Sequence, residues 1–275
     1  MNLRDTAAAW WAAGRPTCIV ELQAVRGSTP REAGARMLVA AEDACGSIGG
    51  GHLEWLALRE ARNALAPGAP LPQPQVLSLG PSLGQCCGGE VTLAWRRLDA
   101  RALADWPEPP LRLALHLFGA GHVARALVRL LAPLEGLRIV WIDEREEEFA
   151  HFMQGGTAWP APLEIRCVDA VEAEVATLPA GGAALVMTHE HALDERLVEA
   201  LLRREDLGWL GLIGSASKRA RFGSRLRARG LAEARFERLH CPVGVPGLLG
   251  KAPEEIAIAI AAQLLRAHPP RGGAG

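Results

Sequence analysis

Short apolar runs alternate with amphipathic segments along the second half of the chain. Apolar runs without polar interruptions indicate strands buried on both faces of a sheet. The segments between them have the period of helices, and a helix between two strands makes those strands parallel. This half therefore predicts an α/β fold with a doubly wound parallel sheet. The expected strands are LRLALHLF (111–118), LRIVWID (137–143), LEIRCVD (163–169), AALVMTH (183–189) and WLGLIG (209–214).

The first hundred residues have a different pattern. Short apolar runs at 18–25, 35–40 and 90–95 are separated by glycine and serine turns, and residues 52–65 have the period of a helix. This pattern predicts a smaller α+β domain over residues 1–100. Residues 101–111 contain three prolines without helical or strand periodicity, which is typical of a linker.

The second domain is expected to span residues 112–275. Its last helix, at 253–267, begins with Pro253 followed by Glu254 and Glu255, whose charges favour a helix N-terminus. This helix is expected to pack back on one of the domains.

Composition narrows the classes of function. The chain has 275 residues, 49% hydrophobic and 22% charged, with a net charge of −1, so no overall field attracts nucleic acid or an anionic membrane. The arginines of residues 217–230 are spaced like the exposed face of a helix. There is no signal-peptide pattern and no apolar run of membrane-spanning length, so we expect a cytoplasmic protein whose six cysteines are reduced thiols. Cys18 and Cys167 are expected to be buried packing residues.

The sequence Gly119-x-Gly121-x-x-Ala124 follows a predicted strand and opens a predicted helix, as a dinucleotide-binding fingerprint does. Asp143 ends the next strand, where a carboxylate can accept hydrogen bonds from a ribose. Arg145 nearby could instead bind a phosphate on that ribose, so this alternative stays open. NAD(P) is therefore a candidate cofactor. The alternative is a Rossmann-like domain whose loop binds another phosphate or no ligand.

Two further strand ends carry polar residues at the expected ligand-binding edge. His189, His191 and Asp194 could hold a metal, but we prefer a crevice of hydrogen-bonded residues with Asp194 at a helix start. Ser215 and Lys218 open the next helix, where they could bind a phosphate. Simple N-capping by Ser215 or Ser217 explains the same pattern.

The first domain has two candidate sites. The run Gly49, Gly50, Gly51 precedes His52 and a helix, so its N–H groups could bind an anion, or it could form only a turn. A disulfide between the neighbours Cys86 and Cys87 would need a strained ring, so we expect two thiols there. The N–H groups of Gly88 and Gly89 favour the thiolate form, which could contact sulfur or a soft metal. A four-ligand structural zinc is disfavoured because the sequence has no Cys-x-x-Cys pair to complete the four ligands.

The assembled motifs resemble the xanthine dehydrogenase accessory proteins of the XdhC/CoxI family. The resemblance covers nearly the whole chain and includes VRGSTPREAGARMLV, GSIGGGHLEW, GPSLGQCCGGEVTL, LFGAGHVARAL, VWIDERE, VMTHEHALD, LIGSASKRARF and GVPGLLGKAPEEIAIAIAAQL. The GQCCGG motif resembles the xanthine dehydrogenase branch. His52 stands where the branch associated with carbon monoxide dehydrogenase often has cysteine.

This resemblance implies a chaperone that binds molybdopterin cofactor while a cysteine desulfurase supplies its sulfido ligand. The cofactor then enters the molybdenum-binding subunit of xanthine dehydrogenase. In this interpretation Cys86 or Cys87 contacts molybdenum or its sulfur ligand, and the glycine loops hold the phosphate. The alternatives are a nicotinamide-dependent oxidoreductase and a docking protein without a small ligand; the sequence leaves homo-oligomerisation open.

Overall fold

The chain forms two compact units, Met1–Glu108 and Pro109–Gly275. The computed structural model describes residues 3–80, 88–153, 162–248 and 250–269. The division between the units falls inside the predicted linker, but the start of that linker is helical. Helix α3 (Ala100–Ala104) is capped by Asp99, whose side chain accepts a hydrogen bond from the Ala102 backbone N–H at 2.6 Å. Burial of Ala102 against Ala7 and Leu98 explains why this segment folds with the first unit.

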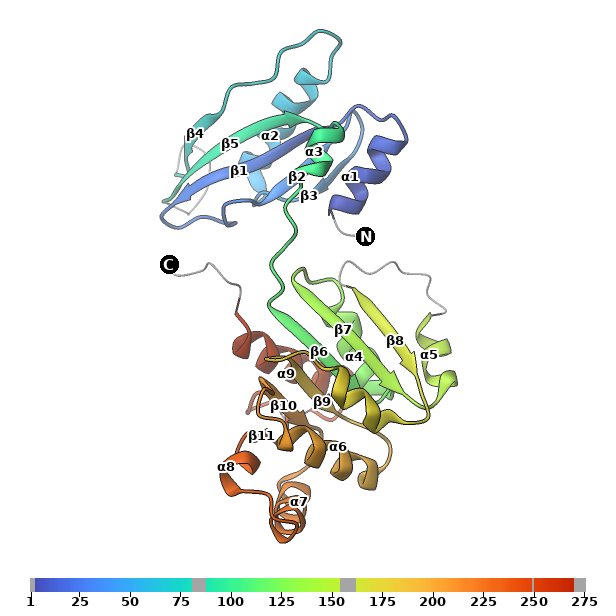
Figure 1. The fold of residues 1–275 in the computed structure, drawn as a ribbon. Coiled ribbons are helices and arrows are strands. Elements are labelled where there is room, and N and C mark those ends of the chain that lie inside the picture. The colour runs from blue at the N-terminus through green and yellow to red at the C-terminus, as the bar shows by residue number, and fades with distance from the viewer. Residues whose placement is uncertain (1–2, 81–87, 154–161, 249, 270–275) are drawn as a thin grey trace. The chain divides into compact units, whose positions relative to one another are not determined.

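The first unit contains an antiparallel sheet in the order β3-β2-β1-β5-β4. Helix α2 covers one face through Leu53 and Ala57, and helices α1 and α3 cover the other (Figure 1). Alternate residues of β1 therefore face different helices, since Val20 packs with α2 whereas Ile19 packs with α1 and α3. The elements are α1 (Leu3–Ala12), β1 (Cys18–Arg26), β2 (Arg36–Val39), β3 (Ala44–Gly46), α2 (Gly51–Ala64), β4 (Gln75–Ser78), β5 (Glu90–Arg97) and α3.

The second unit is a parallel sheet with helices on both faces. Its elements are β6 (Leu113–Phe118), α4 (His122–Leu131), β7 (Leu137–Asp143), α5 (Glu146–Met153), β8 (Leu163–Cys167), the 3-10 helix η2 (Val171–Thr177), β9 (Ala183–Val186), α6 (His191–Arg203), β10 (Trp209–Leu212), α7 (Ala216–Ala228), α8 (Glu233–Phe236), β11 (Leu239–His240) and α9 (Pro253–Ala267).

The strand order β11-β10-β9-β6-β7-β8 is that of the Rossmann fold. The chain leaves β6 toward β7 and β8 on one side and later returns to β9, β10 and β11 on the other. Helices α4, α5 and α9 share one buried cluster, and η2, α6, α7 and α8 share the other. The predicted fold class is confirmed, and the last helix packs on α4 of the second unit. The reversal of strand order between β6 and β9 is where such sheets bind ligands.

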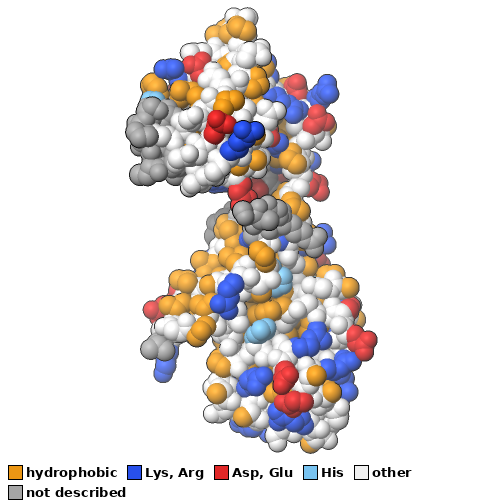
Figure 2. Space-filling model, turned by 90° about the vertical axis from the view of Figure 1, so that its left-hand side faces the viewer, with side chains coloured by type: hydrophobic (Ala, Val, Ile, Leu, Met, Phe, Trp, Pro, Cys, Tyr) orange, Lys and Arg blue, Asp and Glu red, His pale blue; other side chains and the backbone are white. Residues whose placement is uncertain are grey.

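On the face shown in Figure 2, the described residues form no continuous basic region. Arginine and lysine side chains alternate there with acidic ones. Helix α7 illustrates the pattern. Arg225 in α7 and Arg229 at its C-cap bind Glu195 of α6, and Arg227 in α7 binds Glu233. Among the described residues, no helix is long and apolar enough to cross a membrane.

Candidate functional sites

Three loops of the first unit meet at one end of its sheet. The β1–β2 loop contacts Gly89 so closely that a Cβ on this glycine would lie 2.3 Å from the Ser28 carbonyl oxygen. The same loop contacts the glycine run before α2, because a Cβ on Gly49 would lie 2.4 Å from Cγ of Pro30. The packing therefore brings together motifs that are separated by more than fifty residues in the sequence.

Cys86 and Cys87 lie outside the described residues, in the connection between β4 and β5. At the described ends of this connection, the Leu79 N–H donates to the Gly89 carbonyl at 2.7 Å, continuing the ladder of the two strands. Gly88 is exposed. The predicted roles of Cys86, Cys87 and Gly88 stay predictions, while the ends of their connection are fixed beside the β1–β2 loop.

The glycine run before α2 binds an anion, which is the carboxylate of Glu54. Its Oε1 accepts hydrogen bonds from the backbone N–H groups of Ile48, Gly49 and Gly50 at 3.0, 3.2 and 2.8 Å. The Ser47 hydroxyl donates to the same oxygen at 2.5 Å. The sequence predicted converging N–H groups here but missed the internal carboxylate that they hold. An external phosphate at Gly50 would have to displace Glu54.

The exposed side of α2 carries an aromatic stack that the sequence analysis also missed. His52 stacks on Trp55 with ring centroids 5.2 Å apart, and the Arg59 guanidinium carbon lies 4.9 Å from the Trp55 ring centroid. The spacing of three and four residues along a helix could have revealed this stack. Gly51 and His52 are exposed at the start of α2, and their predicted contact with a phosphate stays a prediction.

We expect Glu54→Gln to destabilise the first unit and to change its response to acid. Burial alone would raise the pKa of Glu54, but the hydrogen bonds from Ser47 and three backbone N–H groups outweigh it and lower this pKa. A lowered pKa in the folded state stabilises the fold above the pKa of the unfolded chain, and this stabilisation is lost as the pH falls through the folded value.

Denaturant unfolding should show a free energy of unfolding lower by about 1–2 kcal/mol at pH 7, because a charged acceptor is lost. The difference between native and variant should shrink in acid, as the pH falls through the lowered pKa of Glu54 and the carboxylate becomes protonated. Glu42→Gln, an exposed change in the same unit, is the control. A deficit of the variant that is the same at pH 7 and in acid would contradict the role of the carboxylate charge.

In the second unit, β6 leads into the turn that contains both fingerprint glycines. Gly119 has φ +111°, and a Cβ on it would lie 2.3 Å from the Met187 carbonyl oxygen. Gly121 caps α4 with an ordinary φ of −67°, and a Cβ on it would meet no atom within 4 Å. Ala124 is buried against the sheet, as its small size predicted. Thus Gly119 is required by the fold, whereas neither backbone conformation nor packing requires Gly121.

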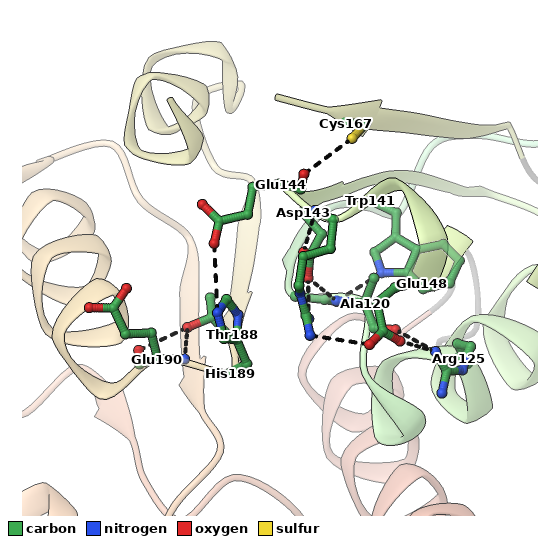
Figure 3. A network of polar contacts seen from close by, with 12 residues as sticks. Ala120, Arg125, Trp141, Asp143, Glu144, Glu148, Cys167, Thr188, His189 and Glu190 are labelled. Carbon is green, nitrogen blue, oxygen red and sulfur yellow. Dashed lines mark hydrogen bonds and ion pairs between the residues drawn. The ribbon is translucent and has the colours of Figure 1, made fainter. Parts of the chain in front are cut away.

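The carboxylate of Asp143 binds the glycine turn at Ala120 (Figure 3) and also binds Arg145. Its Oδ2 accepts from the Ala120 N–H at 2.7 Å and from Arg145 Nη2 at 2.9 Å. Its Oδ1 accepts from the Arg145 backbone N–H at 3.0 Å and from Nε at 2.9 Å. Burial alone would raise the pKa of Asp143, but these hydrogen bonds lower it. The four acceptor positions of the carboxylate are used, so a ribose hydroxyl would have to displace one donor.

A small pocket lies where β6, β7 and β9 end. Its lining includes Gly119, Asp143, Glu144, Thr188 and His189. The side chains of Glu144 and His189 face each other across it, with Oε1 and Nε2 3.7 Å apart (Figure 3). The structure thus places His189 and Asp143 at one crevice, as predicted from their positions at strand ends. Their contact with a cofactor stays a prediction.

Asp194 and Lys218 form a buried ion pair, with side chains only 1% and 7% exposed. The Lys218 ammonium donates to Asp194 Oδ2 at 2.6 Å and to the Ile213 carbonyl at 3.0 Å. Thr188 donates to Asp194 Oδ1 from its backbone N–H at 3.0 Å and from its hydroxyl at 2.7 Å. A phosphate contact by Lys218 would require this pair to separate. Among the described residues, no cluster of histidine, cysteine and carboxylate suits a metal.

Ser215 caps α7 by accepting a hydrogen bond from the Lys218 backbone N–H at 3.2 Å. The N-capping alternative for Ser215 is therefore confirmed, and its phosphate role stays a prediction. Cys18 is buried as expected, but the expectation for Cys167 is wrong because this residue is exposed at the end of the edge strand β8. Partial desolvation, followed by the charges of Glu146 and Asp143, raises the pKa of the Cys167 thiol, which opposes thiolate reactivity.

Fold and sites define a protein in which a glycine-rich α+β domain precedes a Rossmann domain with a polar crevice. The sequence model of the XdhC Rossmann domain matches residues 115–264, and that of the XdhC and CoxI family matches residues 10–77. The chain belongs to the XdhC and CoxI family.

Two known proteins resemble the chain along nearly its whole length. The uncharacterized protein YqeB of Escherichia coli strain K12 is 30% identical over 269 residues, which are 97% of this chain. The chain spans about half of that relative's length, 46%. A crystal structure described as a xanthine dehydrogenase from Bacillus halodurans is 21% identical, covers 100% of this chain and 98% of its own, and has a TM-score of 0.75. The second likeness shows that the fold is shared.

Proposed function

We propose that this protein binds the molybdopterin form of the molybdenum cofactor and delivers it to xanthine dehydrogenase. Membership of the XdhC and CoxI family supports an accessory role in the maturation of that enzyme rather than a catalytic one. In this proposal a cysteine desulfurase supplies the sulfido ligand while the cofactor is held. The molybdenum-binding subunit of xanthine dehydrogenase is the acceptor.

The convergence of three loops in the first unit is the observation that carries this proposal. The connection that contains Cys86 and Cys87 ends beside the β1–β2 loop, where Gly89 contacts Ser28. Thiolates are suitable ligands for a soft metal or its sulfur. Arg26 and Arg31 are exposed on or beside the β1–β2 loop, where their charges favour the cofactor phosphate. The described end of the cysteine-containing connection and the two arginines therefore lie at the same end of the sheet, which supports the proposal.

The test is the molybdopterin and molybdenum content of the full chain purified from a molybdenum-replete host. We expect the native protein to retain both, and Cys86→Ala or Cys87→Ala to lose most of the bound metal. Cys167→Ala is the matched control, since its thiol is exposed in the second unit and has a raised pKa. Melting temperatures of the variants establish that they are folded.

The alternatives predict different results. A native protein that holds no cofactor and cannot be loaded with free molybdopterin would rule out the proposal. Binding to xanthine dehydrogenase under those conditions would instead favour a docking protein without a small ligand. Hydride transfer that is unaffected by removal of both cysteines would favour the nicotinamide-dependent oxidoreductase.

A further inference from the structure

The pocket of the second unit is not used by the proposed molybdopterin site. It lies at the carboxyl ends of β6, β7 and β9. Strand β6 is the first strand of this sheet in sequence, and β7 and β9 are its two neighbours. In open parallel sheets this reversal point is where nucleotides bind, because the strand ends and their loops diverge there. The pocket lies entirely within the second unit, so its function can be tested independently of the cysteines of the first.

The carboxylate available in this pocket belongs to Glu144, one residue beyond the end of β7. Asp143 is only 3% exposed and already accepts four hydrogen bonds from Ala120 and Arg145. In contrast, the Glu144 side chain is 40% exposed, and the 44% exposed His189 faces it at 3.7 Å. A hydroxyl can therefore reach Glu144 without breaking the bonds that hold the glycine turn.

The charges around Glu144 disfavour a phosphate at the same position. Arg145 and Arg196 are cations near Glu144, but both are engaged elsewhere. The Arg145 guanidinium binds Asp143 at 2.9 Å and Glu148 at 3.1 Å, and Arg196 binds Glu172 at 2.6 Å. A carboxylate with two acceptor oxygens suits the vicinal hydroxyls of an unmodified ribose, whereas a phosphate beside it is repelled.

Space beside Gly121 adds room for a diphosphate next to this pocket. A Cβ on Gly121 would meet no atom within 4 Å, although this residue has a φ that other residues adopt readily. The turn from Gly119 to Gly121 connects the pocket lining with the first turn of α4. A diphosphate at Gly121 would receive backbone N–H groups while the attached ribose reached Glu144.

We propose that this pocket binds an adenosine dinucleotide with free ribose hydroxyls, and that Glu144 selects against a 2′-phosphate. The shared chemical unit is adenosine 5′-diphosphate, which both a dinucleotide and free ADP contain. The exposure of Glu144 and the open space at Gly121 support binding and its specificity, and no reaction is assigned to the nucleotide.

Calorimetric titration of the full chain with NAD+, NADP+ and ADP tests the proposal. We expect NAD+ to bind at least ten times more tightly than NADP+, and more tightly than ADP. Glu144→Gln should lower the affinity for NAD+ by about tenfold, since hydrogen bonds to a charged acceptor are lost. It should also reduce the ratio between the affinities for NAD+ and NADP+. The exposed Glu146, in the first turn of α5, provides the control Glu146→Gln, which removes the same charge.

Gly121→Ala supplies a second variant that keeps the fold. Because the added methyl group has open space and φ suits alanine, the melting temperature should stay close to the native value, while NAD+ affinity falls at least tenfold. If titration with NAD+ up to millimolar concentration gives neither binding heat nor saturation, the proposal is overturned. Equal affinities for NAD+ and NADP+, an unchanged affinity in both variants, or tighter binding of ADP than of NAD+ would also overturn it. Failure of NAD+ binding leaves the cysteine test unaffected.

Discussion

Lys218→Ala is expected to lower the free energy of unfolding of the second unit by about 3–5 kcal/mol, because it leaves a buried charge without its partner. The Asp194 carboxylate is 1% exposed, so water cannot replace the lost ammonium. The network also joins four segments: Thr188 after β9, Ile213 after β10, Asp194 in α6 and Lys218 in α7. Its loss therefore loosens the strand ends together with the helices that follow them.

Calorimetric or denaturant unfolding of the full chain measures this effect on the transition of the second unit. Lys251→Ala is a matched control, since Lys251 is exposed and is the other lysine of the sequence. The double variant Lys218→Met with Asp194→Leu should be more stable than Lys218→Ala, because no charge is left buried. A loss below about 1 kcal/mol in Lys218→Ala, a value typical of surface ion pairs, would contradict this description.

Gly119→Ala is the second change with a large expected effect, a loss of about 2–6 kcal/mol from backbone strain and overpacking together. At φ +111° an alanine is strained, and its Cβ would lie 2.3 Å from the Met187 oxygen and 3.0 Å from the Thr188 nitrogen. These neighbours are backbone atoms at the end of β9, so relief requires the sheet itself to move.

Gly121→Ala provides the internal comparison for Gly119→Ala. It introduces the same methyl group two residues later, at φ −67° and with open space, so its free energy of unfolding should stay within about 1 kcal/mol of the native value. Thermal unfolding of the two variants side by side measures the difference. Similar effects of the two substitutions would show that Gly119 is not constrained as described.

Hydrophobic patterning was sufficient to predict most strands of the second unit, since their residues are buried on both faces. Elements with weak patterns were missed, including β11 with two residues and the edge strand β4, in which Val76 is 62% exposed. Short or exposed strands depend on pairing with a neighbour rather than on their own periodicity. The exposure of Cys167 has the same cause, because β8 lies at the edge of its sheet.

The sites were predicted by position but not by partner. The fingerprint indicated Asp143 as a ribose ligand, yet the folded chain directs that carboxylate to Ala120 and Arg145. Charged side chains are held by whichever donors the packing brings within about 3 Å, and sequence spacing does not specify those distances.

By itself, the sequence determined the fold class, because apolar runs and helical periods are local consequences of burial. It also determined which backbone segments can present N–H groups, since glycine and helix starts are visible in the chain. Only the tertiary structure decided that Glu54 fills the glycine run, that Lys218 is buried against Asp194, and that Glu144 faces the pocket. Those outcomes depend on distances between segments remote in sequence, which are set when the sheets and helices pack together.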